Sequence, residues 1–110
     1  MQKCDLLYLN LSFIEQHYSE DISIEDISSF CGLNRSYFSK VFRDTLGESP
    51  QGFLLHYRMA RAAQLLTESR LPISTISTMV SYPNQLHFSR AFKNVYGISP
   101  RDYRAKHLAL

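Results

Sequence analysis

Apolar residues recur along the chain at intervals of three and four positions, and clusters of glycine, serine and proline separate the runs. Such spacing places apolar side chains on one face of an α-helix, whereas the strict alternation typical of half-buried strands persists nowhere. The pattern therefore predicts an all-α fold of seven helices. The first covers about residues 3–17, and its apolar residues are Leu6, Leu7, Leu9, Leu11, Phe13 and Ile14.

Two short helices come next, over about residues 23–47. Ser23 is placed to cap the first, Asp26 occupies the third position of a capping box, and Gly32 ends the helix. Its apolar residues are Ile24, Ile27, Phe30 and Cys31. The second begins near Asn34 and stops at Gly47. Its inner face consists of Phe38, Val41 and Phe42. Two short helices joined by a turn that contains glycine are typical of a helix-turn-helix.

This unit is repeated later in the chain. The segment YFSKVFRDTLGESP, residues 37–50, returns as HFSRAFKNVYGISP, residues 87–100. Upstream, Ile27 matches Ile76 at a separation of forty-nine instead of fifty, so the second copy has gained one residue in its turn. The apolar residues after Pro72 are Ile73, Ile76, Met79 and Val80, and those after Asn84 are Phe88, Ala91, Phe92 and Val95. Because two copies are too few for a solenoid, the repeat indicates a duplicated functional unit.

Each copy ends in Gly-x-Ser-Pro, a sequence that closes one helix and starts another. Glycine can adopt the left-handed conformation, serine can cap the next helix, and proline suits its first position. The pattern predicts a first helix-turn-helix unit over about residues 3–49, a connecting helix over about 50–68 and a second unit over about 72–107. The apolar residues of the connecting helix are Phe53, Leu54, Tyr57, Ala62, Leu65 and Leu66. The seventh helix runs from Pro100 to about Lys106.

Composition limits the class of protein. With 110 residues, 45% hydrophobic and 20% charged, the chain has the size and balance of one soluble domain. No apolar run approaches the ~18 residues of a membrane helix, and the first residues lack the order of a signal peptide. We therefore expect a cytoplasmic protein with no membrane partner. Cys4 and Cys31 form no CxxC motif, and the apolar surroundings of Cys31 predict a buried thiol.

Charge is distributed unevenly along the chain. Residues 1–34 contain one basic residue and six acidic residues, whereas the remainder contains eleven basic and four acidic residues. The net charge of +2 conceals this asymmetry. A basic later segment favours an anionic partner.

The second helix of a helix-turn-helix enters the DNA major groove, so its outward residues decide whether DNA binding is credible. In the first copy these are Arg35, Ser36, Ser39, Lys40 and Arg43, and in the second they are Gln85, Leu86, His87, Ser89, Arg90 and Lys93. Arginine and lysine can contact guanine, glutamine can contact adenine, and serine is adaptable. Individually, these residues also suit the solvated face of an amphipathic helix. Their matched recurrence favours DNA contact.

The chain also resembles a known protein family. Two segments are similar to recurrent motifs in the DNA-binding domain of AraC/XylS-type bacterial transcription regulators. They are FSRAFKNVYGISPRDYR, residues 88–104, and YRMARAAQLL, residues 57–66. The likeness covers the whole chain. The resemblance implies two helix-turn-helix units bridged by a long helix. It also implies base-reading positions at Ser36, Ser39 and Lys40 in the first unit, and at Gln85, Leu86, His87 and Arg90 in the second. Ser81, followed closely by Pro83, stands where the family usually has a glycine.

The expected function is sequence-specific binding of double-stranded promoter or operator DNA, and through it the regulation of transcription. Two recognition helices would enter successive major grooves, ~34 Å or ~10 bp apart, on a non-palindromic site. The resemblance implies RNA polymerase as a further partner and no cofactor. Family members commonly carry a separate sensing domain, so this chain is either a stand-alone short regulator or, as we expect, the C-terminal piece of a longer one. We expect the isolated domain to be monomeric.

Other functions fit the residues less well. The four histidines, His17, His56, His87 and His107, show no metal-ligand spacing, so we expect no metal site. No nucleophile motif or phosphate-binding glycine loop suggests an enzyme. The alternative that stays open is a helical protein-interaction module, for which the acidic first third and exposed tyrosines Tyr8, Tyr18 and Tyr37 would serve. Salt-sensitive retention on duplex DNA discriminates the two.

Overall fold

The computed structural model describes residues 3–108 of the chain, with side chains over residues 8–108. The described part contains seven helices and no strand, which confirms the predicted all-α fold. The helices are α1 (Lys3–His17), α2 (Ile24–Phe30), α3 (Arg35–Leu46), α4 (Pro50–Glu68), α5 (Ile73–Met79), α6 (Gln85–Tyr96) and α7 (Pro100–His107). The side chains of Cys4, Leu6 and Leu7 lie outside the described residues.

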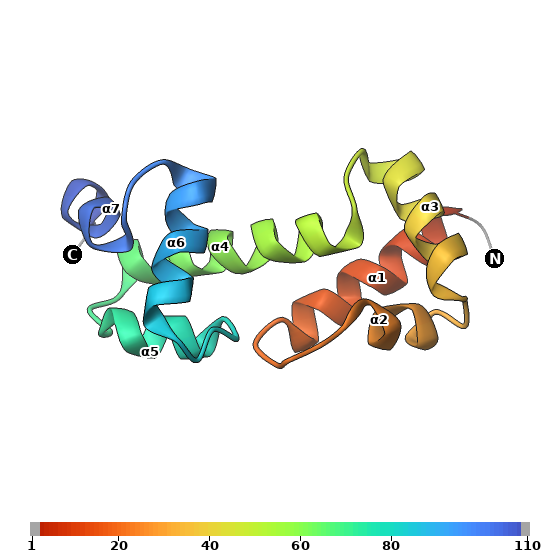
Figure 1. Ribbon diagram of the computed structural model, residues 1–110, viewed down its shortest axis with the longest axis horizontal. Helices are drawn as coiled ribbons and strands as arrows, with labels where there is room; N and C mark the ends of the chain where they lie inside the picture. Colours follow the sequence, from red (N-terminus) through yellow and green to blue (C-terminus); the bar gives the residue numbers. More distant parts are fainter. Residues whose placement is uncertain (1–2, 109–110) are drawn as a thin grey trace. The chain divides into compact units, whose positions relative to one another are not determined.

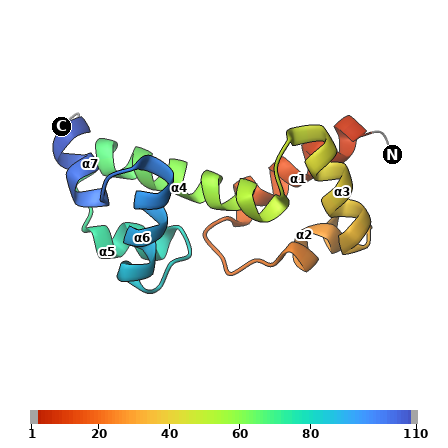
Figure 2. The same cartoon turned by 45° about the horizontal axis from the view of Figure 1, so that its top comes forward.

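The chain forms two compact units, the first ending at Leu55 and the second beginning at His56. Helix α4 continues without interruption across this division. In the first unit, α1 packs against α2 and α3, and α2 runs into α3 through a tight turn (Figure 1). In the second unit, α5 packs against α6 in the same manner, and α6 packs against α7 (Figure 2). Each unit thus contains one helix-turn-helix.

The predicted caps start the helices. The Ser23 hydroxyl accepts a hydrogen bond from the Asp26 amide at 3.1 Å, and the Asp26 carboxylate accepts one from the Ser23 amide at 2.9 Å, completing the capping box. Asn34 caps α3 and Asn84 caps α6 through their side-chain oxygens. The Ser23 and Asn34 side chains each satisfy one amide that a helix N-terminus leaves unpaired, and Asn84 satisfies two. Replacement of such a cap by Ala typically costs ~1 kcal/mol.

The two units use equivalent aromatic contacts in their cores. Phe42 packs edge-on against Phe53 with ring centroids 5.5 Å apart, and Phe92 packs edge-on against Tyr103 at 5.3 Å. Both pairs join a recognition helix to the helix that follows it. Because such pairs contribute about 0.5–1.5 kcal/mol beyond the area that they bury, they hold each Gly-x-Ser-Pro junction in place.

The same backbone hydrogen bonds close both helix-turn-helix turns. The amide of Leu33 donates to Ser28 at 2.9 Å, and the amide of Tyr82 donates to Ser77 at 2.9 Å. In the first turn, Gly32 supplies the left-handed residue, with φ of 73°. In the second, Ser81 takes this conformation with φ of 70°, and no other described residue besides glycine has positive φ. The departure from glycine leaves the turn geometry intact, but it places serine in a conformation that costs about 1–2 kcal/mol.

The second turn has an additional side-chain hydrogen bond. The buried Ser77 hydroxyl donates to the carbonyl of Tyr82, whereas the equivalent Ser28 hydroxyl donates to the carbonyl of Glu25 within its own helix. Ser77 therefore ties the end of α5 to the residue before Pro83. The extra residue of the second copy lies just beyond this tie.

Arg104 of α7 binds the C-terminal end of α4. Its Nε donates to the carbonyl of Leu66 at 3.2 Å, and its Nη2 donates to the carbonyl of Ser69 at 3.4 Å. Carbonyls at a helix C-terminus lack partners within the helix, so a cation there satisfies both hydrogen bonding and the helix dipole. Arg104, the last residue of the RDYR sequence, thus has a structural role in the second unit.

Some sequence expectations about exposure were wrong. Phe30 and Met79 belong to the apolar stripes of α2 and α5 by spacing, yet they are 53% and 39% exposed. The next residue in each unit, Cys31 and Val80, is buried, so the packed stripe runs through that residue, and Phe30 and Met79 lie at its edge. Tyr18, expected to be exposed, is half-buried.

Cys31 is buried as predicted. Its thiol donates to the side-chain oxygen of the buried Asn10 at 3.4 Å. Burial raises the pKa of the Cys31 thiol above its ordinary value. Because the thiolate is the nucleophile and the metal ligand, this environment favours an inert structural thiol.

Candidate nucleic-acid interface

Helix α3 carries the first set of predicted DNA-binding residues. Ser36, Lys40 and Arg43 are exposed and Ser39 is half-buried, on the side away from Phe38 and its neighbours in the core. We call Ser36, Ser39, Lys40 and Arg43 the α3 face. Because residues three and four positions apart are neighbours on a helix, these four side chains form one continuous surface.

One further residue, Asp44, shares the α3 face. It lines the same shallow hollow as Ser36, Ser39, Lys40 and Arg43. The sequence interpretation missed it, although its spacing of four from Lys40 is the available signal. A carboxylate at this place can accept a hydrogen bond from the amino group of cytosine, and it repels phosphate.

Arg35 differs from the rest of the predicted set because it has an acidic partner. Its Nη1 pairs with Oε1 of Glu25, which joins α3 to α2 across the turn. Both side chains are more than half exposed, so the pair contributes little to stability. In this structure Arg35 therefore stands beside the α3 face, held by Glu25.

Helix α6 carries the second set. Ser89 is half-buried, and the other five of the six predicted outward residues are exposed: Gln85, Leu86, His87, Arg90 and Lys93. We call them the α6 face. The Asn84 oxygen accepts hydrogen bonds from the amides of Leu86 at 2.9 Å and His87 at 3.1 Å, which fixes the first turn of the helix. Leu86 is 58% exposed, whereas Phe88 and Phe92 on the opposite face of the helix are fully buried.

The two faces have matched charges. Lys40 and Arg43 on α3 occupy the positions of Arg90 and Lys93 on α6. In each helix the two cations lie one turn apart and are exposed. Cations in this arrangement can contact bases and flanking phosphates at once.

The described part of the chain contains neither a candidate membrane-spanning helix nor a cluster of metal ligands. None of its helices is both long and apolar enough to span a bilayer. Nowhere in it do three histidine, cysteine or acidic side chains converge as metal ligands would.

Comparison with known proteins identifies the fold. Residues 27–106 match a family model described as a helix-turn-helix domain, which is more than half of the chain. The structure is similar to that of a transcriptional regulator from Chromobacterium violaceum, described as an AraC-type DNA-binding domain-containing protein. The TM-score is 0.89 at 29% identity, over 96% of this chain and 95% of that one. The chain belongs to the AraC-type helix-turn-helix family. The matched residues of this AraC-type domain include all of α3 and α6.

Other AraC-type relatives agree. The lactose operon transcription activator of Staphylococcus xylosus is 37% identical over 94 residues, 86% of this chain and 34% of that protein. The C-terminal domain of AraT, a response regulator from Geobacillus stearothermophilus, is 33% identical with a TM-score of 0.91, over 96% of this chain and 88% of that one. This AraC-type chain spans about a third of the length of the curated relatives it matches. The family is one of DNA-binding transcription regulators.

Proposed function

We propose that this chain binds a specific double-stranded DNA sequence through α3 and α6, each in a major groove, and thereby regulates transcription. The two grooves are successive, about 10 bp apart. The observation that carries the proposal is the matched pair of exposed faces, each with two cations one helical turn apart on a helix-turn-helix. The two faces differ in their other residues, so the DNA site is asymmetric.

The first test is selection from a pool of random duplexes by fluorescence anisotropy and sequencing, at two salt concentrations. The expected site contains two sequence blocks about one helical turn apart. Binding should weaken steeply with salt, because cations that neutralise phosphates release counterions. Binding that does not depend on salt, or none to any duplex, would favour the protein-interaction module.

Substitutions then assign the blocks to the helices. Lys40→Ala and Arg90→Ala are each expected to lower the affinity about 5- to 150-fold, the range that corresponds to 1–3 kcal/mol for a good base contact. Each should relax selectivity in one block and leave the other unchanged. Lys106→Ala removes the same charge from an exposed position on α7, outside both faces, and is expected to change affinity less than about 3-fold. An equal effect of all three variants would contradict the assignment.

The proposal extends to the other partners that the resemblance implies. We expect the isolated domain to sediment as a monomer and to form a one-to-one complex with its DNA site, in the cytoplasm and without catalytic activity. It also contacts RNA polymerase. In vitro transcription from a promoter that carries the selected site measures this contact, and unchanged transcript levels with the site fully occupied would contradict it.

A further inference from the structure

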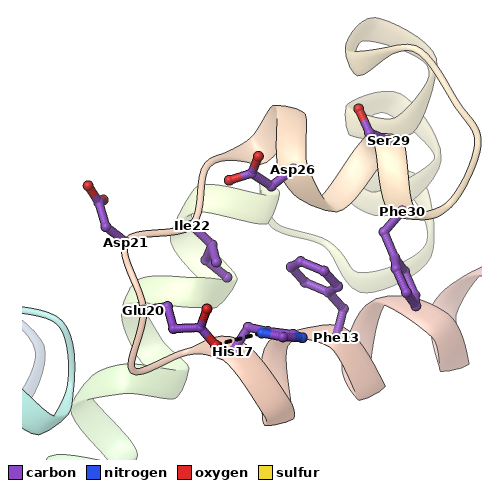
Figure 3. A pocket seen from close by; sticks show the side chains of 8 residues that line it. All are labelled: Phe13, His17, Glu20, Asp21, Ile22, Asp26, Ser29 and Phe30. Carbon is purple, nitrogen blue, oxygen red and sulfur yellow. Dashed lines mark hydrogen bonds and ion pairs between the residues drawn. The ribbon is translucent and has the colours of Figure 1, made fainter.

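A groove lies in the first unit between the C-terminal part of α1 and α2 (Figure 3). All of its described lining residues come from these two helices and the loop that joins them, so it is separate from the α3 face. It encloses about 670 Å³. Its apolar part consists of Phe13, Ile22 and Phe30. The rings of Phe13 and Phe30 lie 4.9 Å apart, and about half of Phe30 is exposed.

The polar part of the groove is acidic. Among the described lining residues, Glu20, Asp21 and Asp26 are carboxylates and none is a lysine or arginine. His17 contacts Glu20 at 2.6 Å, and Asp26 accepts the capping hydrogen bond from Ser23. Because a carboxylate has about four acceptor sites, Asp26 retains capacity for a second donor. Asp21 is exposed and points outward at the rim (Figure 3).

We infer that this acidic groove docks a segment of another protein in which arginine or lysine stands next to an apolar side chain. Aromatic ring faces attract cations electrostatically, and carboxylates form charge-assisted hydrogen bonds with them. Both kinds of group line this groove. The ring pair Phe13 and Phe30 also offers apolar surface, which a neighbouring leucine or methionine would cover.

Charge and shape favour a protein segment over other occupants. Nucleic acid carries one phosphate charge per strand every 3.4 Å and is repelled by three carboxylates. Small ligands are held in sites that bury most of their surface, whereas this groove is open to solvent along its length. The groove is thus chemically opposite to the basic α3 face, and both can be occupied at the same time.

The test uses the ¹⁵N-labelled domain and a synthetic helical peptide. The peptide is alanine-based, acetylated and amidated, with two arginines and two leucines on one face. We expect saturable amide shifts confined to the C-terminal part of α1, to α2 and to the loop between them. A matched peptide with glutamate in place of arginine should bind at least ten-fold more weakly.

Three variants localise the binding. Phe30→Ser and Asp21→Asn are each expected to weaken binding of the arginine peptide about 3- to 10-fold. Asp21 is exposed and Phe30 is about half exposed, and neither belongs to the buried core, so we expect the fold to tolerate the changes. Glu15→Gln removes the same charge from an exposed position on α1 that does not line the groove, and should leave binding unchanged.

Several outcomes would overturn the inference. These are absence of saturable shifts, shifts located on α3 or α6, or equal weakening by Asp21→Asn and Glu15→Gln. Self-association of the unliganded domain that Phe30→Ser abolishes would assign the groove to a second copy of this chain instead. DNA affinity of Phe30→Ser should remain unchanged, so failure here is distinguishable from failure of the proposed DNA-binding function.

Discussion

The outward positions that we propose to contact DNA carry chemically different residues in the two units. Ser36 of α3 corresponds to Leu86 of α6, and Arg35 corresponds to Gln85. An exposed leucine offers no hydrogen bond, so the only base feature that it matches in the major groove is the 5-methyl group of thymine. The α6 face therefore favours a thymine in its block, whereas the smaller Ser36 leaves the first block to hydrogen bonding.

Replacement of that thymine by deoxyuridine, which lacks only the methyl group, should reduce affinity about 3- to 4-fold. This corresponds to the ~0.8 kcal/mol gained for each buried methyl-sized group. Anisotropy titrations with the two duplexes measure the change. In the Leu86→Ala variant the two duplexes should bind equally well. If they still differ, another residue reads the methyl group.

The pairing of Arg35 with Glu25 predicts that Glu25 limits DNA affinity. Glu25→Gln removes the acidic partner and leaves Arg35 available for phosphate, so affinity should rise about 2- to 5-fold, most strongly at low salt. Glu15→Gln provides the same change in net charge at a distance from α3. Should both variants raise affinity equally, net charge and not the release of Arg35 would be the cause.

Sequence predicted the outward faces of the recognition helices because the helical period alone sets them. It could not predict that Arg35 pairs with Glu25, since that contact depends on the angle between α2 and α3. Asp44 was overlooked because it is acidic among cations. Phe30 was assigned to an apolar stripe whose packed side runs through its neighbour Cys31, and spacing alone did not separate the two.

At the scale of elements, the turn of the second unit holds a serine where its counterpart holds glycine. Ser81 and Gly32 have φ of 70° and 73°, and the backbone hydrogen bonds around them are equivalent. The geometry is thus imposed by the packing of α5 and α6 and by the Ser77 tie, and the serine adopts it under strain.

Ser81→Gly should relieve this strain and stabilise the domain by about 0.5–1 kcal/mol, after allowance for the greater flexibility of glycine in the unfolded chain. Urea denaturation measures the change. Ser74→Gly makes the same substitution at an exposed position inside α5 and should destabilise by about 0.5 kcal/mol. If Ser81→Gly also fails to stabilise the domain, Ser81 carries no strain.

The contact of Arg104 with the end of α4 predicts a second stability effect. Arg104→Ala leaves the carbonyls of Leu66 and Ser69 without this donor and should cost about 1–2 kcal/mol. Arg101→Ala, on an exposed part of the same helix, should stay within about 0.5 kcal/mol. Thermal unfolding of the two variants compares them. If Arg101→Ala costs as much, the loss reflects net charge.

Element boundaries followed closely from sequence because their signals are local: the caps Ser23, Asn34 and Asn84, and the glycines Gly47 and Gly97. The buried face of α4 was less predictable. Its buried residues after the division are Met59, Ala62, Ala63 and Leu66, a helical stripe of which only two were expected. Tyr57 and Leu65, which belong to the apolar residues that the sequence predicts for this helix, are only half-buried.

At the scale of the whole molecule, each unit has a core of its own. Phe38 and Phe88 occupy equivalent positions, and both are completely buried. Within the first unit, acidic and basic side chains are separated in space. The acidic groove is formed by α1, α2 and the loop between them, whereas the basic face lies on α3. Sequence predicted the duplication from matched residues. It could not predict the groove, which arises from the packing of α1 against α2.

Separate cores predict separate unfolding. Phe38→Ala should cost about 3–5 kcal/mol and accelerate amide exchange in the first unit, including α4 up to Leu55. Phe88→Ala should do the same for the second unit, from His56 onward. Native-state hydrogen exchange by NMR resolves the two patterns. If each substitution accelerates exchange along the entire chain, the domain unfolds as one cooperative body.

The uninterrupted path of α4 between the two units has a consequence for avidity. Once one recognition helix docks, the other searches only the small volume that its tether allows, so it meets its half of the site at high effective concentration. The association constants of the two contacts then multiply, with the effective concentration as a factor, provided that the half-sites have the spacing that the tether can span. An operator in which this spacing changes by half a helical turn loses the benefit while every base contact is preserved, so the distance between the half-sites is itself part of the recognised sequence.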